Sequence, residues 1–123
     1  MMMSDYFSIL QCESEDSLSG IIRIQLNPDC RVYQGHFPKE PVSPGVCNIE
    51  MIRCCAEYIH HHPIRIRKIK QCKLTALMTP QITPQANVTI SLQENEQGVY
   101  RLTASICEGE TTYMTLKADV ADE

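Results

Sequence analysis

The residues best suited to chemistry lie in one short stretch, residues 35–50, which holds a histidine, an expected helix start and a carboxylate. His36 stands at the head of a loop that carries a proline at every third position. An imidazole titrates near neutral pH and can remove a proton. The backbone N–H groups of Gly45 and Val46 could hold a developing enolate oxygen. Glu50 could stay protonated in an apolar pocket and act as an acid.

Together these groups favour proton abstraction next to a carbonyl. Each group also has an ordinary structural alternative. A histidine beside a proline-rich loop often serves packing alone, and a single glutamate in an apolar helix usually faces solvent. Residue types alone therefore leave both interpretations open.

One helix and about six strands are expected to position this stretch. Residues 46–59 contain no Gly or Pro and are strongly apolar, which predicts a helix buried on most sides. Ser43 suits the N-cap and Pro44 the first helical position. Alternating apolar residues and turn signals predict strands at 6–11, 18–26, 64–77, 87–93, 99–107 and 111–120. One helix against an antiparallel sheet is an α+β layout, and we expect residues 1–123 to form a single domain.

The string GHFPKEPVSPGV at residues 35–46, followed by Glu50, resembles the signature of the FabZ-type 3-hydroxyacyl-[acyl-carrier-protein] dehydratases. The resemblance implies a hotdog fold, in which an antiparallel sheet wraps around one long central helix, over residues 18–120. Glu50 follows His36 by fourteen positions (50 − 36), as in that family. The related FabA-type isomerising enzymes carry Asp at this position, so Glu50 favours the FabZ type.

The resemblance also implies a role for each matching residue. His36 would remove the proton α to the thioester carbonyl, and Glu50, from the partner subunit, would protonate the departing hydroxyl. The N–H groups of Gly45 and Val46 would polarise the carbonyl. The product would be a trans-2-enoyl thioester and water, with no metal or organic cofactor. The expected acyl tunnel would be lined by Phe37, Val46, Ile49 and Cys54.

Two departures from the family pattern keep other functions open. Cys54 replaces a Gln, and Arg53 stands where family members usually have a small residue. Glu50, Arg53 and Glu57 share one helix face, and an ion pair of Arg53 with Glu50 would weaken proton donation. That pairing would support a non-catalytic acyl-thioester-binding subunit. A hotdog thioesterase is the rival enzyme.

Composition limits the partners and the compartment. With a net charge of −4, the chain is a poor candidate for nucleic-acid binding, and it has no apolar stretch long enough to span a membrane. Seven cysteines without a C-x-x-C pair argue against a disulfide framework or a zinc site, and favour the cytoplasm. We expect no metal at His60, His61 and His62, which predict a solvated helix end.

One basic segment is the candidate surface for a protein partner. Its side chains would suit either a solvated strand face or the docking of an acidic acyl carrier protein. They are Arg65, Arg67, Lys68 and Lys70. A lone hotdog would leave a strand edge open, so we expect a homodimer, with a trimer of dimers as a larger assembly.

Overall fold

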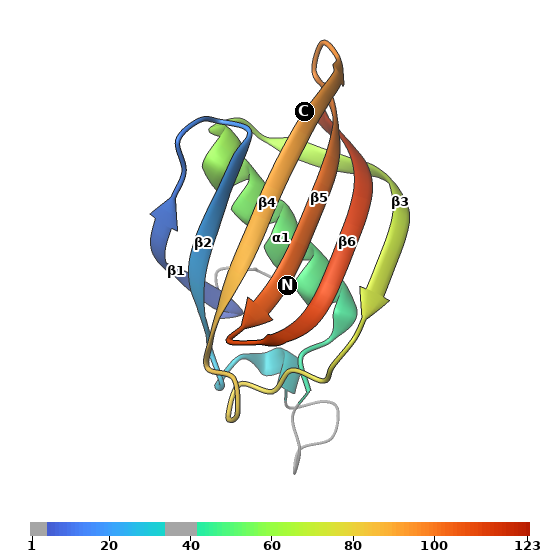
Figure 1. Ribbon diagram of the computed structural model, residues 1–123. Coiled ribbons are helices and arrows are strands. Elements are labelled where there is room, and N and C mark those ends of the chain that lie inside the picture. The colour runs from blue at the N-terminus through green and yellow to red at the C-terminus, as the bar shows by residue number, and fades with distance from the viewer. Residues whose placement is uncertain (1–4, 34–41) are drawn as a thin grey trace.

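The computed structural model describes residues 5–33 and 42–123, and in these residues an antiparallel sheet curls around one helix. Figure 1 shows the helix, α1, crossing the inner face of the sheet, with β1 and β3 at the sheet's two ends. The order across the sheet is β1-β2-β4-β5-β6-β3. The strands are β1 Phe7–Glu13, β2 Ser19–Leu26, β3 Ile64–Leu74, β4 Gln85–Glu96, β5 Val99–Glu108 and β6 Thr111–Asp122. The predicted α+β layout is confirmed.

The helix α1 spans Gly45–His60 and buries one face against β2, β3 and β4. Its buried residues recur every three or four positions, which is the period of a helix packed on one side. They are Cys47, Asn48, Met51, Ile52, Cys55, Ala56 and Ile59. The opposite face is partly buried, and the exposed residues on it are Val46 near the start of the helix and Tyr58 near its end.

The start of α1 differs from the prediction by one residue. Pro44, in extended conformation, is the N-cap and makes no side-chain capping bond. Ser43 is instead buried, with its Oγ 3.0 Å from the hydroxyl of Tyr33 and its N–H donating to the carbonyl of Met78. The hydroxyl is therefore used to fix the segment before the helix, where a buried polar group needs a partner.

A second buried bond ties the helix to the N-terminal strand. The Tyr6 hydroxyl donates to Asn48 Oδ1 at 2.6 Å, and the Tyr6 ring stacks on Tyr33 with the centroids 6.0 Å apart. Burial raises the pKa of Tyr6, so the phenol keeps its proton and remains a donor. The hydrogen bond from Tyr6 to Asn48 thus fixes the start of α1 in addition to its apolar packing.

The far end of α1 is less solvated than the sequence suggests. His60 Nε2 lies 3.0 Å from Asp122 Oδ1, Nδ1 lies 3.2 Å from the Ser17 carbonyl, and the ring meets Tyr100 edge-on. The prediction of a solvated end is wrong for His60, because the C-terminus of β6 folds over it. No helix within the described ranges is long and apolar enough to cross a membrane.

Candidate active site

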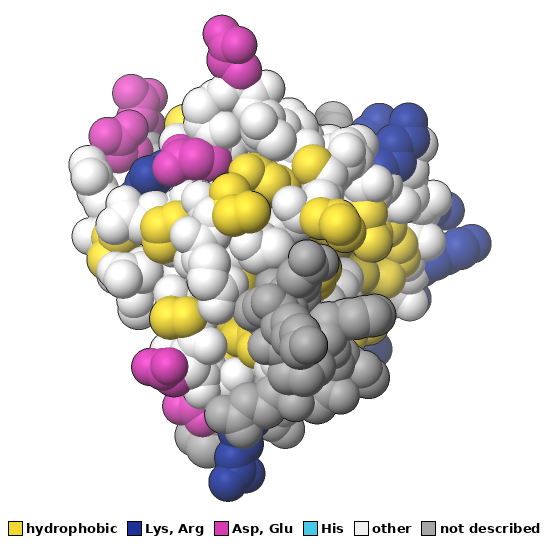
Figure 2. All heavy atoms as spheres, turned by 90° about the horizontal axis from the view of Figure 1, so that it is seen from below, with side chains coloured by type: hydrophobic (Ala, Val, Ile, Leu, Met, Phe, Trp, Pro, Cys, Tyr) yellow, Lys and Arg dark blue, Asp and Glu magenta, His cyan; other side chains and the backbone are white. Residues whose placement is uncertain are grey.

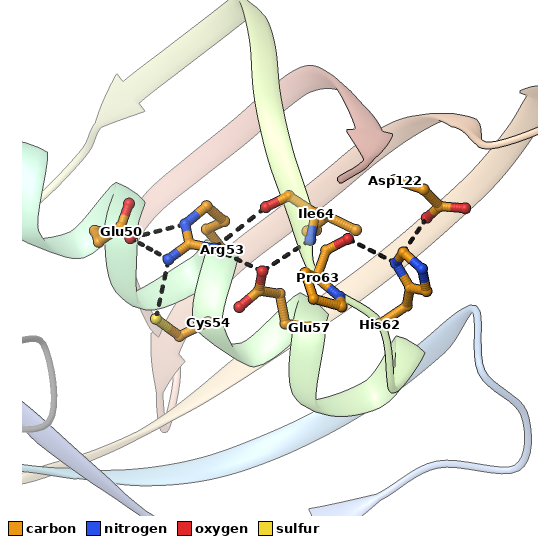
Figure 3. Close-up of polar contacts among 8 residues, drawn as sticks. All are labelled: Glu50, Arg53, Cys54, Glu57, His62, Pro63, Ile64 and Asp122. Carbon is orange, nitrogen blue, oxygen red and sulfur yellow. Dashed lines mark hydrogen bonds and ion pairs between the residues drawn. The ribbon is translucent and has the colours of Figure 1, made fainter.

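A stripe of side chains on the open face of α1 carries the predicted acid. Val46, Glu50, Arg53 and Glu57 follow one another at helical spacings of three and four, so they share a face. This face turns toward the start of β3: Arg53 Nη1 donates to the Ile64 carbonyl at 3.2 Å. The Ile64 N–H donates to Glu57 Oε2 at 2.8 Å. Figure 3 shows these contacts running from Glu50 along the helix to β3.

Glu50 and Arg53 form an ion pair, as their spacing on the helix allows. Arg53 Nε donates to Glu50 Oε1 at 2.7 Å, and Nη2 donates to the same oxygen. Arg53 Nη1 also lies 2.7 Å from Glu57 Oε2. The hydrogen bonds that Arg53 donates to Glu50, together with the nearby carboxyl groups of Glu50 and Glu57, raise the pKa of Arg53. One guanidinium is thus shared by the two glutamate side chains.

An apolar surface flanks this stripe on β3. Ile69, Cys72 and Leu74, which we call the β3 shelf, are all exposed. Their cross-strand partners on β6 are Ala118, Leu116 and Met114, all buried against the helix side of the sheet. Directly opposite residues of a strand pair point to the same face. The shelf therefore projects toward the helix side but lies beyond what α1 covers.

The helix start meets the end of this shelf. A Cβ on Gly45 would stand 3.4 Å from Leu74 Cδ1, so the two elements are in close contact there. The next residue, Val46, is 75% exposed. Leu77 and Ile82, in the connection after β3, add to this surface. Figure 2 shows several hydrophobic side chains exposed on this face of the molecule.

The other predicted site residues fall in three groups. His36 and Phe37 lie outside the described residues. Gly45, Val46, Ile49 and Cys54 lie on α1 with Glu50, and Gly45 is the first helical residue. Ile49 packs against the core, while Cys54 is half-buried and burial raises the pKa of its thiol. Arg65, Arg67, Lys68 and Lys70 are exposed on β3.

Sequence reasoning missed the β3 shelf. The signal was present, since apolar residues recur along residues 64–74, but nothing local shows that this strand lies at the edge of the sheet. Within the described residues, no group of His, Cys, Asp and Glu has an arrangement that could hold a metal ion. The geometry instead brings a carboxylate, a helix N-terminus and an open apolar surface together, which suits an acyl chain with a polar head.

Comparison with known proteins decides the family. Residues 11–115 match a family described as ApeI-like, the ApeI dehydratase. The chain belongs to this family. FabZ 3-hydroxyacyl-[acyl-carrier-protein] dehydratases are also similar. The one from Wolbachia pipientis wMel is 28% identical over 89% of this chain and 80% of that protein. The one from Levilactobacillus brevis is 29% identical over 71% of this chain and 67% of that protein.

Solved structures agree on the fold. The dehydratase heterocomplex ApeI:P from Xenorhabdus doucetiae superposes with a TM-score of 0.69 at 16% identity, covering 93% of this chain and 96% of that one. The E. coli PaaI protein gives 0.67 at 6% identity, over 95% and 79%. A thioesterase from Haemophilus influenzae gives 0.62 at 14%, over 98% and 82%. The predicted hotdog fold is confirmed, and the ApeI-like family match together with the FabZ relatives supports the predicted FabZ-type dehydratase.

Proposed function

We propose that this member of the ApeI-like dehydratases removes water from a (3R)-3-hydroxyacyl thioester, carried on acyl carrier protein, to give the trans-2-enoyl thioester. The observation that carries the proposal is the position of Glu50. It stands on the open face of α1, one turn after the helix start at Gly45 and Val46 and beside an apolar surface. Such a surface suits an acyl chain, and the helix start suits the thioester carbonyl.

The residues would share the reaction as follows. His36 takes the proton α to the carbonyl, and the electron pair moves onto the thioester oxygen. The N–H groups of Gly45 and Val46 stabilise that oxygen, because the first N–H groups of a helix have no intrahelical acceptor. The enolate then re-forms the carbonyl, and its electron pair makes the α,β double bond as the β-C–O bond breaks. Glu50 gives its proton to the leaving hydroxyl, which departs as water. His36 ends protonated and Glu50 ionised, and exchange with solvent restores both.

A homodimer is part of the proposal. Strand β3 lies at the end of the sheet, so one side of its backbone has no partner strand within the described chain. Pairing β3 with the β3 of a second copy would extend the sheet and cover the β3 shelf. In this proposal, His36 of one copy acts with Glu50 of the other. A two-fold pairing uses the same strand on both copies, as most homodimers do. Three such dimers would form the larger assembly.

The outer side of β3 supplies the proposed carrier-protein dock. Arg65, Arg67, Lys68 and Lys70 are exposed there, on a chain that is acidic overall. Lys70 lies 3.7 Å from Asp119, and Arg101 also pairs with that carboxylate at 2.8 Å. The other three cations have no ion pair among the described residues. They remain available to an acidic partner.

A reducing compartment completes the proposal. All seven cysteines are free thiols, and Cys30, Cys47 and Cys55 are buried. Free thiols persist in the cytoplasm, where disulfides are rare. We therefore place the reaction there.

One experiment separates this function from its two alternatives. The protein is incubated with a 3-hydroxyacyl thioester and with the plain acyl thioester, each on acyl carrier protein and on coenzyme A. Enoyl absorbance from the first substrate, without thiol release, supports the dehydratase. Thiol release from the plain thioester would support a thioesterase. Binding without turnover would support the non-catalytic subunit, the alternative in which the Glu50–Arg53 pair impairs proton donation.

A further inference from the structure

The Glu50 side chain is fixed through one of its two carboxyl oxygens, Oε1. It is 38% exposed, on a helix face that the sheet does not cover. Within the described residues, its hydrogen-bond partner is Arg53, which donates from Nε and from Nη2 to the same oxygen, Oε1. The second oxygen, Oε2, has no hydrogen-bond partner in residues 5–33 and 42–123. An exposed glutamate without such a contact samples several rotamers, most of which would move its carboxylate away from a substrate.

Arg53 is itself fixed from two elements. Its Nη1 lies 2.7 Å from Glu57 Oε2 on the next turn of α1, and 3.2 Å from the Ile64 carbonyl at the start of β3. Glu57 is fixed in turn, because it accepts the Ile64 N–H at 2.8 Å. The planar fork of a guanidinium can meet these acceptors at once, whereas a lysine ammonium is a single point charge. Figure 3 shows Arg53 standing between Glu50 on one side and Glu57 with Ile64 on the other.

We propose that Arg53 is a positioning residue for Glu50: it uses Oε1 to fix the carboxylate and leaves Oε2 to face the substrate. This inference rests on the proposed function of Glu50 as the group that acts on the leaving hydroxyl. Arg53 touches neither substrate nor reacting atoms, and it acts through Glu50 alone. Glu57 and the Ile64 carbonyl are the brace that keeps the guanidinium in place, so the position of Glu50 depends on the junction between α1 and β3.

A kinetic cycle tests the inference. Arg53→Met keeps the apolar stem and removes the fork, and we expect kcat to fall about tenfold with KM changed less than about twofold, because misplacing a reacting group lowers the rate of the bound complex. Arg53→Lys should recover part of the loss. In a Glu50→Gln background, Arg53→Met should cost no further activity, since the group that it positions is already gone.

The control is Arg23→Met. Arg23 is also paired with a carboxylate, that of Glu108 at 2.7 Å, but it lies on β2, away from the proposed site and the proposed carrier-protein dock. This variant should leave kcat and KM unchanged. An unchanged or increased kcat in Arg53→Met would overturn the proposal. An increase would show that Arg53 lowers the catalytic activity of Glu50. An equal loss in the Glu50→Gln background would also overturn it, because Arg53 would then act on the fold.

Crystal structures give a readout that does not depend on turnover. In the wild type, Glu50 should occupy one conformer, with Oε1 against Arg53. In Arg53→Met it should adopt other rotamers, and Glu57→Gln should loosen it less. If Glu50 keeps the same conformer without Arg53, the positioning role is wrong even if the enzyme is active. If the wild type dehydrates no 3-hydroxyacyl thioester, the proposed function fails, while the structures still decide whether Arg53 fixes Glu50.

Discussion

The dimer predicted at the edge of the sheet is open to a quantitative test at Ile69. This residue lies on the helix side of β3, opposite Ala118, and is 44% exposed in the single chain. Burying a whole isoleucine side chain is worth about 2–3 kcal/mol, so covering the exposed part is worth about 1 kcal/mol in each copy. A two-fold dimer buries two copies, which gives about 2 kcal/mol. Ile69→Thr should therefore raise the dimer dissociation constant about 30-fold.

The assay is sedimentation equilibrium over a range of protein concentrations. Threonine keeps the β-branched shape that strands favour, so the monomer fold should persist. Ile21→Thr is the matched control, because Ile21 is 42% exposed but lies on β2, away from β3. We expect this control to dissociate like the wild type. Equal dissociation constants for all three proteins, or a wild type that is monomeric throughout, would refute pairing through β3.

Two further predictions concern the elements that hold the site. Tyr6→Phe leaves Asn48 Oδ1 buried without its donor, so urea denaturation should show that the free energy of unfolding falls by about 1–3 kcal/mol. The control Tyr58→Phe, at the surface, should lower it by less than about 0.5 kcal/mol. Equal losses in the two variants would contradict this prediction. Arg23 donates twice to Glu108, both at 2.7 Å, and lowers the pKa of that carboxyl group. The pair therefore stabilises the fold at neutral pH and is lost as the pH falls through the lowered pKa. The difference in Tm between wild type and Glu108→Gln should be small, present at neutral pH, and lost in acid as the pH falls through the lowered pKa of Glu108. A difference that does not change with pH would contradict the linkage.

Local patterns were enough to predict most of the fold. Alternation of apolar residues located β2. The gap between the predicted strands at 99–107 and 111–120 contains the turn between β5 and β6, where Gly109 has a positive φ of 59°. Strand β3 was harder to interpret. Two register shifts against β6, at Ile66/Lys68 and Ile69/Gln71, break its alternation. The predicted strand at 64–77 accordingly ends earlier, at Leu74.

In the candidate site, as in the fold, local spacing was informative and contacts between distant parts of the chain were not predictable. The spacing of Glu50 and Arg53 on a helix was sufficient to anticipate that they could pair, and they do. Nothing local indicated that Ile64 would brace Arg53, because that contact depends on how β3 leaves the helix. The exposure of Ile69 depends on topology as well. Only the pairing of β3 with the last strand, β6, places it at the end of the sheet.

The central claim is that His36 of one copy and Glu50 of another act on the same thioester. We expect His36→Ala to be inactive and Glu50→Gln to be strongly impaired. Mixing these two variants after dissociation and reassociation tests the claim directly. Random pairing makes half of the dimers hybrid, and each hybrid has one intact site of two, so activity should return to about a quarter of the wild type. If the mixture stays as inactive as either variant alone while hybrids form, the two groups do not share a site across the dimer.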